Sequence, residues 1–172
     1  MGIDLGGPLY TPVYAFWHGT VHAAGYNAEL GDYGHVIVIR HTLTLPLTTT
    51  SLEKLPKEEE VDESTERPAR TNPDDPPDGN QRTVVIYALY GHLDKDSTRR
   101  FHTRGQPVRR GELLGRMGDI HENGGWFGPH VHFQLSVQPP ETHDLPGAVR
   151  PGDRHEALWN YPDPRCILGP IY

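Results

Sequence analysis

The chain has 172 residues with a formal net charge of −7, and 35 % of its residues are hydrophobic. The acidic balance argues against a surface that tracks nucleic-acid phosphates, and no apolar run reaches the length of a membrane span. The single cysteine excludes an internal disulfide and a zinc site built on cysteines. No signal-peptide pattern opens the chain, so the sequence as given predicts a cytoplasmic protein.

Apolar and β-branched residues form strand patterns along much of the chain. Residues 11–17 are strand-like, and the β-branched runs at 35–41 and 83–90 predict two strong strands. Residues 105–118 indicate short strands punctuated by glycines. Alternating apolar residues predict a further strand at 130–137. With 17 prolines and 19 glycines, the composition indicates a turn-rich, mainly β protein or a globular domain diluted by a disordered segment, and the length suits one domain over residues 1–172.

The character of the sequence changes between residues 44 and 82. This segment holds ten acidic and five basic residues, few apolar residues and many prolines, and it has no periodicity. Such a composition predicts a long disordered insertion, placed at a hairpin tip between two strong strands, where extra length is thermodynamically cheap. An acidic docking tail is the functional alternative, although charge runs are more often only solvated.

The sequence also echoes itself. Pro12-Val13 followed by Gly19–Val21 resembles Pro107-Val108 followed by Gly111–Leu113, and two similar hairpin units packed together would fit. Beyond the last strand the chain is rich in proline. We expect an irregular wrap there, with one short helix at 155–160.

Two histidines stand one residue apart at the start of the strand predicted at 130–137. Residues two apart on a strand point to the same face, so His130 and His132 should share one space, with Val131 and Phe133 on the opposite face. Two imidazoles side by side can both bind a metal, or one can bind it while the other moves protons. For the motif alone, a strand with two surface histidines is the simpler alternative.

Four motifs occur in a specific order: Gly-Ile-Asp at 2–4, Tyr-Gly-His-Leu at 90–93, a Val-x-x-Gly-x-x-x-Gly hairpin at 108–115, and Gly-Pro-His-Val-His-Phe at 128–133. Together they resemble the lysostaphin/LytM-type zinc endopeptidases, whose fold is a small antiparallel β structure called the duplicated hybrid motif. The resemblance covers nearly the whole chain, apart from the insertion and about the last thirty residues.

This resemblance implies a zinc site and a reaction. The family holds zinc through a His-x-x-x-Asp pair and the second histidine of His-x-His, to which Asp4 and His132 correspond. His130 and His92 match the two histidines that assist catalysis, one taking a proton from the metal-bound water and the other stabilising the oxyanion or orienting the water. The implied reaction is hydrolysis of a peptide bond, with a peptide or peptidoglycan-like substrate.

The sequence departs from the family pattern at one zinc ligand. The histidine of His-x-x-x-Asp would directly precede Met1, so two of three expected ligands are present. A start at an internal methionine, a domain cut from a larger protein and a degenerate, non-catalytic binding or structural module are the alternatives. A weaker resemblance at 118–126 and 162–170 is to lysostaphin-type domains between a phosphotransferase-like and a class III aminotransferase-like domain, which implies neighbouring domains in a longer chain.

Other residues near these motifs have open assignments. His35 and His41 lie at even spacing along one strand and share a face, and strand-end or surface positions are favoured over the cleft. Trp126 and Phe127 are expected either to form a wall of the substrate groove or to pack under their loop.

Overall fold

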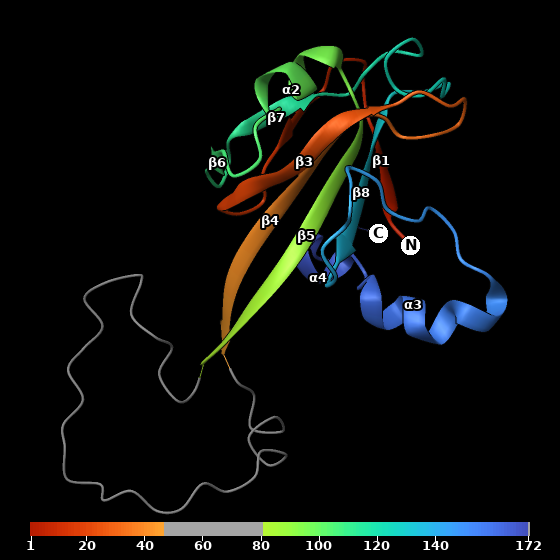
Figure 1. Ribbon diagram of the computed structural model, residues 1–172. Helices are drawn as coiled ribbons and strands as arrows, with labels where there is room; N and C mark the ends of the chain where they lie inside the picture. The colour runs from red at the N-terminus through yellow and green to blue at the C-terminus, as the bar shows by residue number, and fades with distance from the viewer. Residues whose placement is uncertain (47–80, 172) are drawn as a thin grey trace, which may run out of the picture. The chain divides into compact units, whose positions relative to one another are not determined.

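A computed structural model describes residues 1–46 and 81–171 of the chain, and its strands form two sheets (Figure 1). Every strand pair with a described register is antiparallel. The smaller sheet pairs β2 (Pro12–Tyr14) with β7 (Leu113–Arg116). The mainly antiparallel β fold predicted from the sequence is therefore confirmed. The larger sheet has six strands, in the order β1 (Ile3–Gly6), β8 (His130–Ser136), β5 (Gln81–Leu93), β4 (Gly34–Pro46), β3 (Gly19–Asn27) and β6 (Pro107–Val108).

The chain divides into two compact units, Met1–Thr42 with Val85–Tyr172, and Leu43–Val84. The structure describes only the strand ends at 43–46 and 81–84 of the second unit. The insertion predicted at 44–82 thus falls on residues outside the described ranges, except for positions 44–46 and 81–82, which belong to β4 and β5. Both strands therefore run further than their β-branched runs.

Short helices complete the first unit: α2 (Lys95–Arg100), the 3-10 turn η1 (Pro151–Asp153), α3 (Arg154–Asn160) and α4 (Arg165–Leu168). The predicted helix at 155–160 is confirmed by α3. Helix α2 was not predicted. It begins where the Asp94 carboxylate accepts a hydrogen bond from the Ser97 amide. No helix in the described part of the chain is long and apolar enough to cross a membrane.

The two similar hairpin units pair with each other. Strand β3 joins β6 with Gly19 opposite Val108, and β2 joins β7 with Pro12 opposite Arg116. Each of the two hairpins, β2–β3 and β6–β7, therefore contributes one strand to the large sheet and one to the small sheet. This agrees with the two packed hairpins that the internal echo of the sequence suggested.

Strand β8 lies between β1 and β5 in Figure 1, and its alternate side chains point to opposite faces of the large sheet. On one face the buried Phe133 ring packs 5.1 Å from the Tyr90 ring and 5.9 Å from the Phe16 ring. On the other face His130 and His132 open onto a pocket. This opposition is the one that strand alternation predicts. Beside the pocket, a buried apolar cluster supports the same face: Tyr33, Val36, Val38, Tyr87, Leu89 and Leu145.

Candidate metal and catalytic site

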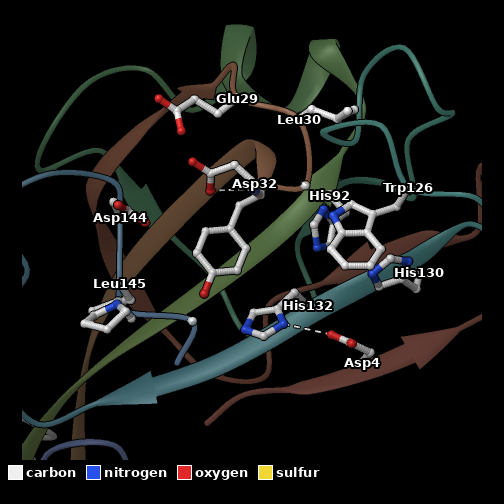
Figure 2. Close-up of a pocket in the computed structure, with 14 residues that line it drawn as sticks. Asp4, Glu29, Leu30, Asp32, His92, Trp126, His130, His132, Asp144 and Leu145 are labelled. Carbon is white, nitrogen blue, oxygen red and sulfur yellow. Dashed lines mark hydrogen bonds and ion pairs between the residues drawn. The ribbon is translucent and has the colours of Figure 1, made fainter. Parts of the chain in front are cut away.

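A pocket with a volume of about 510 Å³ contains all four residues selected from the sequence motifs (Figure 2). Asp4 comes from β1, His92 from the end of β5, and His130 and His132 from β8. The central position of β8 brings together residues as far apart in sequence as Asp4 and His132, which are 128 positions apart.

Asp4 and His132 are direct cross-strand partners in the β1–β8 pair. Such partners have their side chains on one face and in contact, and here Asp4 Oδ1 lies 2.8 Å from His132 Nδ1. The Asp4 side chain is 64 % exposed, so a ligand can approach the pair from solvent. Gly2 flanks the pair, because a Cβ atom there would lie only 2.3 Å from His132 Nε2.

Gln134 fixes the orientation and tautomer of the His132 ring. Its side-chain amide donates to the Pro146 carbonyl at 3.2 Å, which turns Oε1 toward His132 Nε2 at 3.1 Å. A carbonyl oxygen only accepts, so Nε2 carries the proton of the neutral ring. The Nδ1 lone pair of His132 then faces Asp4 Oδ1, so two acceptors lie side by side. This arrangement is favourable only with a cation between Nδ1 and Oδ1, either a proton or a metal ion.

The donor set of this pair suits zinc. A carboxylate oxygen and an imidazole nitrogen are zinc ligands, and a hydrogen bond from the second ring nitrogen to a neighbouring oxygen is typical of metal-bound histidines. Gln134 supplies that hydrogen bond to His132. However, no group of three or more His, Cys, Asp or Glu residues in the described ranges could hold a metal ion. Within the described residues, this pair therefore offers two donors, one fewer than the three protein ligands of a typical catalytic zinc site.

His92 enters the pocket because of an unusual backbone conformation. Its neighbour Gly91 pairs with His132, so simple alternation would turn His92 toward the opposite face. Instead His92 has a φ of 60°, a left-handed conformation that costs a non-glycine residue on the order of 1–3 kcal/mol. Backbone hydrogen bonds hold it there: its N–H donates to the Tyr33 carbonyl at 2.7 Å, and its carbonyl accepts from the Gly118 N–H at 2.9 Å.

The His92 ring is held in one tautomer. Its Nδ1 lies 2.7 Å from the Asn123 carbonyl, to which it donates, so Nε2 of the neutral ring carries a lone pair. Only 3 % of the residue is exposed, and burial lowers the pKa of His92 from 6.5 to about 4. Near neutral pH, His92 is therefore a neutral hydrogen-bond acceptor.

His130 lies beside His92, with ring centroids 4.4 Å apart. Its Nδ1 donates to the Gly128 carbonyl at 2.9 Å, which again leaves a lone pair on Nε2 of the neutral ring. The Trp126 ring meets both histidines in edge-to-face contacts at 5.9 Å. Two nitrogen bases thus sit side by side next to the His132–Asp4 pair.

Asn123 organises the loop at 118–128 that carries these contacts. The residue is buried, and its side-chain amide donates to the carbonyls of Gly118 and Trp126 and accepts from the Gly125 and Trp126 amides. Neighbouring Gly124 presses against the β3–β4 turn, where a Cβ atom would lie 1.9 Å from the Asp32 carbonyl. The loop is thereby locked in place while its Asn123 carbonyl holds His92.

The sequence did not single out Tyr33. Its ring centroid lies 4.8 Å from that of His132, and its hydroxyl lies 3.5 Å from Gln134 Oε1. Burial, reinforced by nearby carboxylates, raises the pKa of the Tyr33 hydroxyl above its usual range, so the phenol stays protonated and can donate.

The remaining candidates lie at or outside the pocket. Trp126 lines it, whereas Phe127 is 91 % exposed and does not. Neither His35 nor His41 is among its lining residues. His35 contacts Thr98 Oγ1 of α2 at 2.9 Å. His41 is fully buried against the Phe16 ring, so its predicted surface position is wrong.

No protein-family model and no curated protein sequence matches the chain. Among solved structures, it is similar to the catalytic domain of the prophage-encoded M23 protein EnpA from Enterococcus faecalis, with 19 % identity over 84 % of this chain and 72 % of that one, and a TM-score of 0.45. It is also similar to the catalytic domain of the antimicrobial peptidase lysostaphin from Staphylococcus simulans, with 16 % identity over 98 % of this chain and 78 % of that one, and a TM-score of 0.48.

A solution structure of lysostaphin gives 18 % identity and a TM-score of 0.42, over 91 % of this chain and 42 % of that one. At such values the likeness says nothing of the site, whose chemistry rests on the contacts within this chain.

Proposed function

We propose that the chain is a hydrolase of peptide bonds that uses zinc. The observation that carries the proposal is the meeting of Asp4, His92, His130 and His132, from three strands, in one pocket. The order of the motifs along the sequence, which resembles that of lysostaphin/LytM-type peptidases, supports the same chemistry. Asp4 and His132 would hold the metal, and the resemblance assigns the third ligand to a histidine directly before Met1.

Zinc, when bound, would act as a Lewis acid toward the peptide carbonyl and the attacking water. The chain's own histidines would handle the proton. His130 presents the Nε2 lone pair of its neutral ring, which can take the proton of the attacking water and return it to the leaving amine. Because the Nδ1–H of His92 is bound to the Asn123 carbonyl, His92 has no free N–H for an oxyanion. Its role in the proposal is to accept a hydrogen bond from the water and orient it.

Metal analysis tests the zinc site directly. We expect about one zinc per chain, by elemental analysis after dialysis, in a protein extended by one histidine before Met1, and clearly less in the chain as it stands, because tetrahedral catalytic sites use about three protein ligands. An extended protein that takes up no zinc would exclude the zinc peptidase. The alternative, a non-catalytic module that keeps the fold, would then be favoured.

Substitution of the two bases tests the catalytic assignment. In the zinc-loaded, extended protein, His92→Ala and His130→Ala should each lower hydrolysis of a responsive peptide by roughly 100-fold or more, the usual loss for a positioned acid–base group. His155→Ala, in an exposed histidine of α3, is the matched control and should leave the rate unchanged. Unchanged rates in the first two variants would remove these roles while leaving the metal site intact.

A further inference from the structure

Tyr33 lies at the point where the supports of two site histidines meet. It directly precedes β4, on a turn that carries none of the four motif residues, and it is buried while lining the pocket. Its side chain contacts His132, and its backbone contacts His92. A residue that contacts both can set how these two histidines lie relative to each other.

The side chain of Tyr33 bears on His132 in two ways. The two ring centroids lie 4.8 Å apart, and Gly91, the cross-strand partner of His132, leaves room for this contact because a Cβ atom there would lie 3.3 Å from Tyr33 Cβ and Cδ1. At its far end the Tyr33 hydroxyl donates to Gln134 Oε1 at 3.5 Å. That oxygen is the one that lies 3.1 Å from His132 Nε2. Tyr33 thus contacts the His132 ring directly and also reaches the amide that orients it.

The backbone of Tyr33 holds His92. Its carbonyl accepts the His92 N–H at 2.7 Å, which is one of the two backbone hydrogen bonds that keep His92 in its left-handed conformation. The direction of this carbonyl is fixed on both sides. The Tyr33 N–H donates to Asp32 Oδ1 at 2.6 Å. On the other side Gly34 has a φ of 60° and packs so closely that a Cβ atom there would lie 2.5 Å from the Glu122 carbonyl oxygen.

We propose that Tyr33 is a positioning residue that holds His132 and His92 in a fixed arrangement, through its ring and hydroxyl on one side and its carbonyl on the other. It rests on the proposed function, because it concerns the geometry of the same site. Groups that hold a metal-bound histidine typically change metal affinity by about 10–100-fold. Tyr33 would act through the two histidines and needs no contact with the substrate.

Two pairs of variants separate a role in the site from a role in packing. Tyr33→Phe removes only the hydroxyl, and Tyr33→Leu removes the aromatic ring. Tyr87 is the matched control, because it is as buried as Tyr33, belongs to the same apolar cluster and does not line the pocket. Tyr87→Phe and Tyr87→Leu therefore remove the same groups from the same cluster without touching His132 or His92.

The first measurement needs no metal. In the zinc-free chain, carbon-13 relaxation of labelled histidine rings reports the mobility of His132, and hydrogen exchange of the His92 amide reports its bond to Tyr33. Tyr33→Leu should make the His132 ring more mobile and the His92 amide exchange roughly ten-fold faster than Tyr87→Leu does. Tyr33→Phe should loosen the His132 ring to a smaller extent and leave the His92 exchange unchanged. Equal responses in Tyr33→Leu and Tyr87→Leu would overturn the inference.

The second measurement is a chelator competition with the histidine-extended protein. Zinc affinity should fall roughly ten-fold in Tyr33→Leu and less in Tyr33→Phe, and it should stay unchanged in both Tyr87 variants. Unchanged zinc affinity in Tyr33→Leu would overturn the inference and leave the proposed zinc site standing. An extended protein that binds no zinc would instead exclude the zinc peptidase, and the zinc-free measurement would then decide the inference by itself.

Discussion

Gly2 directly precedes β1, the strand that carries Asp4, and lies against the imidazole of His132. Because a Cβ atom there would come within 2.3 Å of Nε2, Gly2→Ala must displace the ring or the strand end. Zinc affinity of the histidine-extended protein should fall by roughly ten-fold or more, as expected when a metal-bound histidine loses its support. A competition titration with a chromophoric chelator measures this change.

Gly6 supplies the control within the same strand. A Cβ atom at Gly6 would meet no atom within 4 Å, and its backbone conformation suits alanine. Gly6→Ala should therefore leave zinc affinity unchanged and shift the free energy of unfolding by no more than about 0.5 kcal/mol. Equal zinc affinities in the two variants would show that contact at Gly2 does not position His132.

The buried His92 makes the stability of the metal-free protein depend on pH. Its pKa is about 4 in the folded chain against 6.5 for the free side chain. Between these values the unfolded chain binds a proton that the folded chain does not, so the free energy of unfolding rises with pH in this window. Stability is complete above about pH 6.5, and roughly 3 kcal/mol is lost as the pH falls toward 4.

Urea unfolding with a chelator present, at about pH 7.5 and about pH 4.5, checks this dependence. His92→Asn tolerates the left-handed backbone and removes the titrating group, so it should lose clearly less stability on acidification than the unchanged chain. His102→Asn, in an exposed histidine, should behave like the unchanged chain. The same acid loss in all three proteins would contradict the assignment.

Only part of the site's detail follows from the sequence at this scale. Strand alternation predicts that His130 and His132 share a face opposite Val131 and Phe133. The same rule extended two residues would have drawn attention to Gln134. Strand alternation also predicts that His92 faces away from the pocket, which is wrong because the left-handed backbone conformation of His92 breaks the alternation. Tyr33 carries no local signal, since its contact with the site comes through tertiary packing.

At the level of elements, the 118–128 loop is the support of the two bases. Asn123→Asp keeps the acceptor for the Gly125 and Trp126 amides but replaces a donor by an oxygen that faces the carbonyls of Gly118 and Trp126. The buried mismatch should lower the free energy of unfolding by roughly 2–3 kcal/mol. It should also lower the hydrolysis rate of the zinc-loaded, extended protein by loosening His92.

Asn160→Asp provides the comparison, because the Asn160 side chain makes no hydrogen bond to the described residues. Urea unfolding and peptide hydrolysis of the two variants separate a specific role of the loop from a general effect of added charge. If both variants lose stability equally, the loop is not the element that holds the site.

The limits of sequence reasoning at this scale have physical causes. The strong strands were predicted from β-branched runs, but β4 continues past its run through residues 42–46, and β5 begins two residues before its run and ends three residues after it. Strand β1 was not predicted, because its four residues include a charge and a glycine and it depends on pairing with β8. Helix α2 was missed because six polar residues lack an apolar stripe, and its Asp94 cap becomes evident only in the structure.

For the whole molecule, the position of the negative charges says more than their total. The net charge of −7 argues only against nucleic-acid phosphates. Its location is more informative, because the pocket is lined by Asp4, Glu29, Asp32 and Asp144 without a basic residue among the described ones. No local pattern in the sequence predicts this acidic lining, since its residues come from segments that only folding brings together.

The order of the large sheet also has a consequence during synthesis. Of the described strands, β8 is the last to be synthesised, yet it lies between β1 and β5 and pairs with both. Until it inserts, Asp4 has no His132 beside it and His92 has no His130. Such late, long-range pairing slows folding. It also means that the pocket residues come together only after β8 has been made and has paired with β1 and β5.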